Sequence, residues 1–390
     1  HCKYLVFDDN AILTGMNMSE SYLRDRQDRY LCFSDTALVQ YLSDVTLAVS
    51  EHSHELGAGD EVLSPVADEK DFLSRMNGLC PPLSSSYLSS LSLLSSSSFS
   101  FSSSSTALIP LLQHKGRGLC HEEIVLPALL TARHWRRVVW CSPYPCPPPS
   151  LTASLRQLLS CTPCARQTDS ETVERCEMTF IVPSTSAHGF ASGSGIRSII
   201  PRLHEYTFLD SLQKVVSHSL VSQSVSVSVS LPSVLAYCRP SWTLHSKGMW
   251  LTGPLLDCEE MNKIQPEIAT KDRAERSYDD LSKSERTQQH PLSYSPGSRS
   301  SARSDHLGRC DELSEVHITY IGSSNLSERS WERDFELGFL LVTRDRAVQS
   351  QLSKELTNLM RYTTPLQTHH HPVPLWLRAV AKISRFLKLL

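Results

Sequence analysis

Apolar residues along this chain fall into two kinds of pattern, short runs and helical stripes. Runs typical of strands stand at residues 4–7, 11–14, 30–33, 137–140, 178–182, 316–321 and 338–342. Helical spacing marks residues 121–132 and 151–159, and also the segments that follow two expected N-caps, Ser34 and Thr343. The alternation of strands with helices predicts an α/β fold in which helices flank a mixed sheet.

Two long stretches interrupt these patterns. Residues 79–118 are Ser-rich and contain no charged residue as far as Gln113, but their many serines and Pro81, Pro82 and Pro110 argue against a membrane span. Residues 254–314 are polar and keep no apolar period. We expect both stretches to be disordered insertions. A Val/Ser alternation at residues 217–231 fits either a strand or a further low-complexity segment.

The last segment, residues 374–390, has the pattern of a basic amphipathic helix. Apolar residues share one face, namely Trp376, Val380, Ile383, Leu387 and Leu390, and basic residues share another, namely Arg378, Lys382 and Arg385. This pattern predicts a helix that lies in an anionic membrane interface. A helix packed on the domain is the alternative, and the pattern alone does not choose between the two.

A short motif occurs twice, together with the residues that follow it. The first copy is His1-Cys2-Lys3 and the second is His245-Ser246-Lys247. Each copy is followed by an Asn-x-Ser-Glu block, which begins at Asn17 or Asn325, and then by an Arg/Asp-rich turn and an apolar run. Such self-similarity indicates an internal repeat of a whole supersecondary unit.

The paired motifs suit phosphodiester chemistry. If each motif lies on a strand, its His and Lys point to the same face, so two imidazoles and two ammonium groups can share one pocket. One neutral imidazole can attack phosphorus to form a phosphohistidine, and the other, when protonated, can donate a proton to the leaving oxygen. We expect His1 to be the nucleophile and His245 the acid and later the base, with the reverse assignment open. This scheme requires no metal and no cofactor.

Further polar residues are expected to support the two histidines. Lys3 and Lys247 would supply positive charge, and Asp8 would orient a histidine as a triad carboxylate does. Phosphate-positioning groups are expected at Asn17, Asn325 and Ser323, and supporting carboxylates at Asp28, Asp334 and Glu336.

The motifs resemble those of the phospholipase D superfamily, in which two such halves enclose one active site. The resemblance is carried by residues 1–8, 14–19, 26–30, 242–251, 321–325, 329–330 and 333–334. It implies a pseudo-two-fold repeat of mixed β-sheet flanked by helices. Residues 1–78 would then be the C-terminal part of the first half, and residues 119–253 and 315–362 the two parts of the second half. Because the first motif stands at the first residue, we interpret the chain as a fragment that lacks upstream structure.

Within that superfamily the chain is most similar to the eukaryotic phosphatidylglycerophosphate synthases. This resemblance implies transfer of the phosphatidyl group of CDP-diacylglycerol to sn-glycerol 3-phosphate, with release of CMP, in phosphatidylglycerol and cardiolipin biosynthesis. It also implies a mitochondrial location, peripheral to the inner membrane. Two alternatives stay open: a hydrolytic phosphodiesterase of the same superfamily, and a catalytically incomplete membrane-binding fragment.

Composition and the remaining motifs add no other partner. The net charge is −3 over 390 residues, and the basic residues at 271–303 are interleaved with acidic ones, so nucleic-acid binding is not expected. The twelve cysteines do not form a close-spaced secreted framework. Cys141, Cys146, Cys161 and Cys164 contain a single Cys-x-x-Cys among prolines, so no zinc site is expected. The His triplet at residues 369–371 is expected to be solvated.

Overall fold

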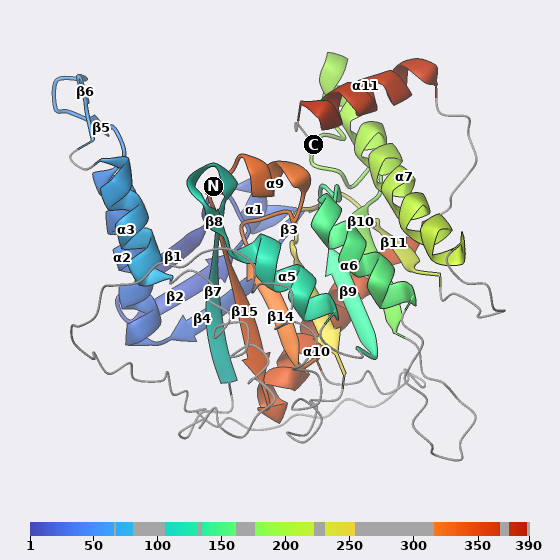
Figure 1. The fold of residues 1–390 in the computed structure, drawn as a ribbon, viewed down its shortest axis with the longest axis horizontal. Helices are drawn as coiled ribbons and strands as arrows, with labels where there is room; N and C mark the ends of the chain where they lie inside the picture. The colour runs from blue at the N-terminus through green and yellow to red at the C-terminus, as the bar shows by residue number, and fades with distance from the viewer. Residues whose placement is uncertain are drawn as a thin grey trace, which may run out of the picture.

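The computed structural model describes residues 1–65, 68–80, 106–131, 135–160, 176–221, 231–253, 316–366 and 374–387. These residues form the mixed α/β structure that the sequence predicts, with helices on both sides of a large sheet (Figure 1). The predicted insertion at 254–314, most of the Ser-rich stretch, the His triplet, and Cys161 and Cys164 lie outside the described residues.

The first eighty residues build a small sheet with its helices. Strands β1 (Tyr4–Phe7), β2 (Asn10–Thr14) and β4 (Tyr30–Ser34) pair antiparallel, and β5 (Glu55–Leu56) and β6 (Val62–Leu63) form a separate hairpin. The helices are α1 (Ser21–Arg24), α2 (Thr36–Glu51) and α3 (Glu69–Leu79). Asp35, rather than Ser34, caps α2, because its side chain accepts a hydrogen bond from the Leu38 N–H.

In the described part of the chain, the large sheet has nine strands in the order β16-β11-β10-β9-β13-β14-β15-β7-β8. Its parallel part is β9 (Arg137–Cys141), β10 (Glu177–Pro183) and β11 (Ser233–Tyr237). Antiparallel pairing continues through β13 (Gly248–Thr252), β14 (Ile318–Gly322), β15 (Glu336–Thr343), β7 (Thr106–His114) and β8 (Leu119–Cys120), and at the other edge β16 (Thr363–Pro365) pairs antiparallel with β11.

Helices cover both faces of this sheet, so its strands read as continuous apolar runs. On one face, α5 (His121–Thr131), α6 (Pro149–Ser160) and α7 (Ile200–Val221) pack on a cluster that includes Trp140 and Met249. On the other face, α10 (Arg346–Met360) packs on a cluster that includes Trp250 and Leu341. The small sheet packs beside α10, against Phe339 of β15 and its neighbours.

Two predictions from the low-complexity pattern are wrong in part. The predicted insertion at 79–118 includes residues 106–114, which form β7, with Leu111 and Leu112 fully buried beside β15. The apolar run within it forms a strand, which the sequence pattern did not predict because serines surround the run. The Val/Ser segment at 217–231 begins as helix, because α7 continues to Val221 and overrides the local strand propensity.

Short elements join the two halves and complete the structure. β3 (Arg26–Gln27) of the first half pairs in parallel with β12 (Thr243–Leu244) of the second. α9 (Glu328–Glu332) follows the second Asn block, and α11 (Leu375–Phe386) packs on α7. Two short 3₁₀ turns, at Lys115–Arg117 and Gly195–Ile199, lie in connections. Among the described helices, none is both long enough and apolar enough to cross a bilayer.

Candidate active site

Each motif histidine is hydrogen-bonded to a carboxylate from the other half of the chain. His1 Nδ1 lies 2.8 Å from Glu336 Oε1, and His245 Nδ1 lies 2.7 Å from Asp28 Oδ2. Asp28 and Glu336 occupy equivalent positions in the two repeats, eleven residues after Asn17 and Asn325. The orienting carboxylate of each histidine therefore comes from the other half of the chain.

Backbone pairing between the halves places Asp28 against His245. β3 and β12 align Gln27 with Leu244, and the His245 N–H then donates to the Gln27 carbonyl oxygen at 2.8 Å. The Arg29 N–H donates to the second oxygen of Asp28 at 2.9 Å. Neither His-x-Lys triplet lies within a strand, since His1 to Lys3 precede β1 and His245 to Lys247 lie between β12 and β13.

Lys247 lies beside His245, as the motif spacing predicts. Its Nζ is 2.8 Å from His245 Nδ1 and donates to the Gly15 carbonyl oxygen at 3.2 Å. A Cβ on Gly15 would lie 3.1 Å from this Nζ, so glycine leaves the space for the buried ammonium group. Burial lowers the pKa of Lys247 to about 8, although Asp28 acts in the opposite direction.

His245 is neutral in the resting site. Burial and the neighbouring Lys247 charge lower its pKa to about 4, and the hydrogen bond to Asp28 only partly opposes them. Since Nδ1 donates to Asp28, Nε2 is the acceptor atom of the ring. A neutral imidazole whose acceptor atom is Nε2 is suited to take up a proton there.

The His1 side of the site is rich in carboxylates. Burial raises the pKa of Glu336 to about 7, and the Ser323 hydroxyl donates to the Glu336 oxygen that His1 does not use. Ser323 is thus placed to hold Glu336. Lys3 donates to the His1 carbonyl oxygen at 2.7 Å, and burial lowers the pKa of Lys3.

Asp334 completes this carboxylate-rich side. One carboxylate oxygen of Asp334, one of Glu336 and one ring nitrogen of His1 lie within 4.8 Å of one another. This spacing would admit a metal ion. The His1–Glu336 hydrogen bond already accounts for the proximity of those two groups. Asp334 also lies 3.6 Å from Arg329.

Tyr22 and Arg26 are site residues that the sequence reasoning missed. The Tyr22 hydroxyl lies 3.0 Å from His245 Nε2 and accepts hydrogen bonds from Arg26 and Asn17, each at 3.0 Å. No motif marks Tyr22. Arg26 belongs to the Arg/Asp-rich turn of the repeat, but only its pairing with β12 brings it to His245.

The two motif asparagines have different surroundings. Asn17 is exposed and donates to Tyr22, whereas the Asn325 side-chain oxygen is buried and has no hydrogen-bond partner among the described residues. The Asn325 backbone is held by the Ser142 hydroxyl at 3.0 Å. Asn325 thus has an unused polar group near the motif.

Asp8 does not join the histidines. It lies exposed in the turn between β1 and β2, with a positive φ of 50°, at the end of β1 remote from His1. The orienting role expected for Asp8 is therefore better filled by Asp28 and Glu336, which contact the imidazoles directly.

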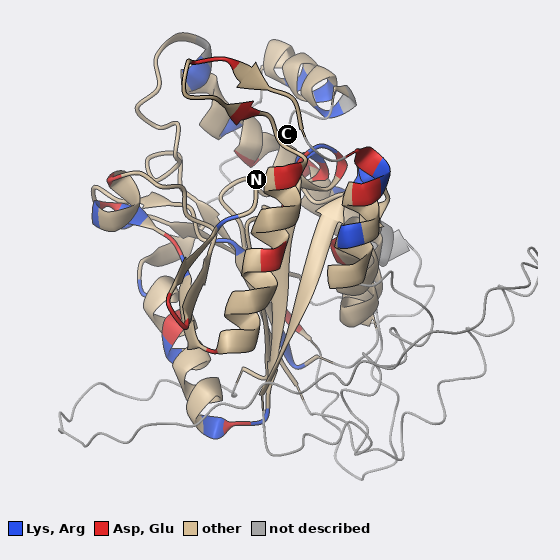
Figure 2. Ribbon diagram, turned by 90° about the vertical axis from the view of Figure 1, so that its left-hand side faces the viewer, with Lys and Arg blue, Asp and Glu red and all other residues tan. Residues whose placement is uncertain are grey.

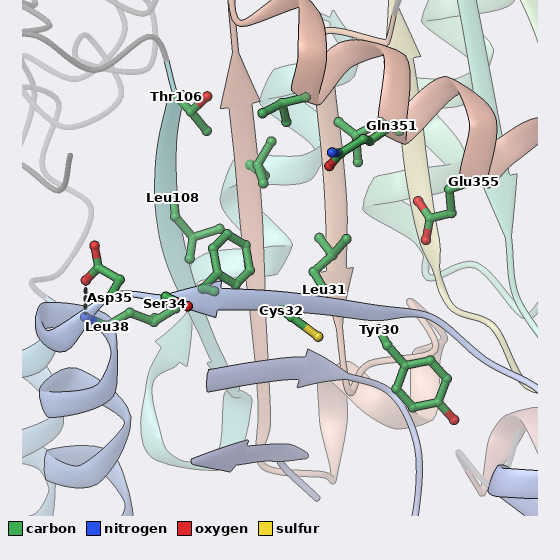
Figure 3. A pocket seen from close by; sticks show the side chains of 14 residues that line it. Tyr30, Leu31, Cys32, Ser34, Asp35, Leu38, Thr106, Leu108, Gln351 and Glu355 are labelled. Atoms are coloured by element: carbon green, nitrogen blue, oxygen red, sulfur yellow. Dashed lines mark hydrogen bonds between the residues drawn. The ribbon is translucent and has the colours of Figure 1, made fainter. Parts of the chain in front are cut away.

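A separate cavity of about 430 Å³ lies between β4 and α10 (Figure 3). Its lining is mostly apolar, with Leu31, Leu108 and Leu352 among its walls, and Glu355 closes one end. None of the motif histidines or lysines lines it. The motif residues, rather than this cavity, define the candidate active site.

Comparison with known proteins identifies relatives of one kind. CDP-diacylglycerol–glycerol-3-phosphate 3-phosphatidyltransferase of Saccharomyces cerevisiae is 23% identical over 94% of this chain, and the mitochondrial human protein of that name is 23% identical over 99%. A probable Dictyostelium discoideum counterpart is 23% identical over 91% of the chain and half of its own length. The chain spans 60% of the yeast and human proteins. No protein-family model matches it.

A solved structure supports the fold. Phosphatidylserine synthase from Haemophilus influenzae Rd KW20 aligns with the whole of this chain and 69% of its own, with a TM-score of 0.53 and 16% identity. The chain therefore shares its overall fold with that synthase. The sequence relatives thus agree with the duplicated motif, and the chain is similar over most of its length to the CDP-diacylglycerol–glycerol-3-phosphate 3-phosphatidyltransferases.

Proposed function

We propose that this chain carries the catalytic centre of a phosphatidyltransferase, which moves the phosphatidyl group of CDP-diacylglycerol to sn-glycerol 3-phosphate and releases CMP. The observation that carries the proposal is the crossed pair of histidines and carboxylates, His1 with Glu336 and His245 with Asp28. The names of the relatives supply the two substrates.

In the first step His1 is the nucleophile. Its Nδ1 is held by Glu336, and its Nε2 has no hydrogen-bond partner among the described residues. The Nε2 lone pair attacks the phosphorus of the phosphatidyl group, and the bond from that phosphorus to the CMP oxygen breaks. The electron pair leaves with CMP. A phosphate oxygen is a weak base, with a second pKa of about 6, so the departure of CMP needs little protonation.

In the second step His245 is the base. The acceptor hydroxyl attacks phosphorus, its proton passes to His245 Nε2, and the phosphorus–nitrogen bond breaks with its electron pair returning to His1. The acceptor alcohol needs a base to remove its proton, whereas CMP leaves with little protonation. The low pKa of His245, about 4, supports the base role because the imidazole is neutral at the start.

Lysine charge and amide donors surround the expected position of the phosphoryl oxygens. Lys3 and Lys247 lie on the two sides of the site. The Asn325 side-chain oxygen has no partner among the described residues, and the NH₂ group of the same amide is the donor that we propose for a phosphoryl oxygen. Fixed positive charge of this kind stabilises the charge that develops during phosphoryl transfer. Ser323 contributes indirectly, through Glu336.

Histidine variants of the full-length protein test this mechanism. His1→Ala should lower CMP release at least about 1000-fold and abolish a labelled phosphoenzyme. His245→Ala should release CMP once and then accumulate the phosphoenzyme, because the base for the second step is missing. His54→Ala, in the exposed β5–β6 region, is the matched control. A phosphoenzyme in His1→Ala, or phosphatidic acid as the sole product with glycerol 3-phosphate present, would contradict the proposal.

We also propose that α11 attaches the protein to an anionic membrane, at the mitochondrial inner membrane. Leu377 and Ala381 pack on Leu203 of α7, while Trp376 and Ile383 remain 54% and 58% exposed. Leu377 and Ala381 are outside the apolar face that the sequence predicts, whereas the exposed Trp376 and Ile383 belong to it. The mitochondrial names of several relatives support the location.

The position of α11 fits a lipid substrate. Arg333, next to Asp334, donates to the Leu387 carbonyl oxygen at the end of α11 at 2.6 Å. Figures 1 and 2 place the N-terminus and the C-terminal end of the chain close together at one end of the molecule. Attachment through α11 would therefore bring the His1 side of the site to the membrane surface that holds CDP-diacylglycerol.

A further inference from the structure

The two repeats differ in charge at one position beside the histidines. Arg26 lies nine residues after Asn17, and Asp334 lies nine residues after Asn325, so the two are equivalent. Arg26 reaches the His245 side through Tyr22, whereas Asp334 lies beside His1 and Glu336. A site with pseudo-two-fold symmetry therefore has one cationic side and one anionic side.

The Arg26 guanidinium is held without a carboxylate. Its Nε donates to the Thr243 hydroxyl at 3.2 Å, and NH1 donates to the Tyr22 hydroxyl at 3.0 Å. Among the described residues, no Asp or Glu forms an ion pair with Arg26, whereas Arg29 pairs with Glu355 and Arg329 with Asp334. An arginine fixed by neutral groups keeps its charge available for an anion.

Gly189 lies beside both Tyr144 and Arg26. A Cβ on Gly189 would lie 3.1 Å from the Tyr144 hydroxyl and 4.0 Å from Arg26 NH2. Gly189 belongs to the connection after β10, whose Ala187 carbonyl oxygen accepts from the Leu244 N–H next to His245. Arg26 NH2 therefore lies near the backbone of Gly189, in a segment that is hydrogen-bonded to the residue before His245.

We propose that Arg26 binds the phosphate of the acceptor, a short polyol phosphate, and so selects the acceptor over water and glycerol; this inference rests on the proposed function. The acceptor hydroxyl takes the place of the Tyr22 hydroxyl at His245 Nε2. Arg26 NH1 and His245 Nε2 each lie 3.0 Å from the Tyr22 hydroxyl. With the acceptor hydroxyl at Nε2, the acceptor phosphate at the far end of the three-carbon chain then reaches Arg26.

Direct titration of glycerol 3-phosphate tests the proposal. Calorimetry on the full chain should detect binding to the wild type, about 10- to 100-fold weaker binding to Arg26→Gln, and an intermediate affinity for Arg26→Lys. Gln is chosen because it can still donate to Tyr22. Arg24→Gln is the matched control, because Arg24 lies on the same turn in an exposed pair with Glu20 and should bind as the wild type does.

Glycerol and CMP are the comparison ligands. Glycerol should bind equally to the wild type and to Arg26→Gln, and CMP should lose less affinity than glycerol 3-phosphate. In the full-length enzyme, the preference in kcat/KM for glycerol 3-phosphate over glycerol should fall about 10- to 100-fold in Arg26→Gln.

Three outcomes would each overturn the proposal. They are equal binding of glycerol 3-phosphate by the wild type and Arg26→Gln, no binding by the wild type, and a larger loss of affinity for CMP than for glycerol 3-phosphate. Failure of the wild type to form phosphatidylglycerophosphate would instead refute the proposed function, and the calorimetry would still decide the role of Arg26.

Discussion

His245 shows how four neighbours set the state of one imidazole. Asp28 accepts from Nδ1 at 2.7 Å, Tyr22 lies 3.0 Å from Nε2, Arg26 holds Tyr22, and Lys247 places a positive charge beside the ring. The phenol can donate to the Nε2 lone pair only while the imidazole is neutral. Tyr22 therefore favours the same neutral state that burial and Lys247 favour.

Removal of this hydroxyl should raise the pKa of His245. In Tyr22→Phe the phenol no longer donates to Nε2, and of its two neighbours only the Lys247 ammonium remains, at 3.3 Å. Protonation of the ring then gives up one hydrogen bond fewer, so the pKa of His245 should move upward from about 4. Histidine NMR titration of selectively labelled protein measures this shift. Tyr4→Phe is the control, since its hydroxyl contacts Leu42 and Thr46 of α2 rather than His245. An unchanged or lower pKa in Tyr22→Phe would show that the phenol does not donate to Nε2.

Helix α11 has two apolar faces, one packed on α7 and one exposed. Leu377 and Ala381 bury one face on α7, and Arg385 adds a hydrogen bond to Asp210 at 3.2 Å. The second face exposes Trp376 and Ile383, with the exposed Arg378 and Lys382 beside it. Elsewhere on the described ribbon, acidic and basic residues are interspersed (Figure 2). The exposed face of α11 is thus apolar with a basic border, which suits an anionic lipid surface.

Acidic substitutions on the exposed face should weaken membrane binding without unfolding the protein. Trp376→Glu with Ile383→Glu should lower partitioning to vesicles that contain anionic lipid by at least about tenfold, because each side chain loses about 1.5 to 3 kcal/mol of burial. Vesicle co-sedimentation measures this. The control Leu47→Glu removes an exposed leucine from α2 and should bind as the wild type does. Equal partitioning of all three proteins would rule out α11 as the attachment.

Helices and strands with their own apolar period could be predicted from the sequence. The stripes of α2 and α10 are examples, although Asp35 and Asp345 cap these helices one and two residues after the expected Ser34 and Thr343. Side-chain acceptors at neighbouring positions compete for the cap, and backbone geometry decides between them. β7 could not be predicted in the same way, because its partner β15 follows more than two hundred residues later.

At the scale of the whole molecule, the buried Arg29 connects the two halves of the chain next to the site. Arg29 forms two 2.8 Å hydrogen bonds with Glu355 of α10, stacks 4.0 Å from the Trp250 ring centre and donates to the Tyr320 carbonyl oxygen at 2.7 Å. Its neighbour Asp28 orients His245. The same contacts therefore join the two sheets and fix a carboxylate of the active site.

A Cβ at Gly248 should break this connection. Gly248 has a φ of +155°, and a Cβ there would meet the Arg29 guanidinium and lie 2.6 Å from the Tyr320 carbonyl oxygen. Gly248→Ala should therefore lower the free energy of unfolding by about 3 kcal/mol, the scale of a broken buried ion pair. Urea unfolding measures the change. Gly78→Ala, in α3 with open space around it, should instead be neutral or stabilise the protein by up to about 1 kcal/mol. Similar stabilities for the two variants would contradict the role assigned to Arg29.

The sequence by itself determined the duplicated motif, the two histidines and lysines, the α/β class and the resemblance to a superfamily, because these depend on local pattern and spacing. The tertiary structure decided which groups meet. It brings Asp28 and Glu336, rather than Asp8, to the imidazoles, it places Tyr22 and Arg26 at His245, and it turns part of the Ser-rich stretch into β7. Each of these contacts joins residues from opposite halves or distant strands, so only the pairing of β3 with β12 and of β7 with β15 could reveal them.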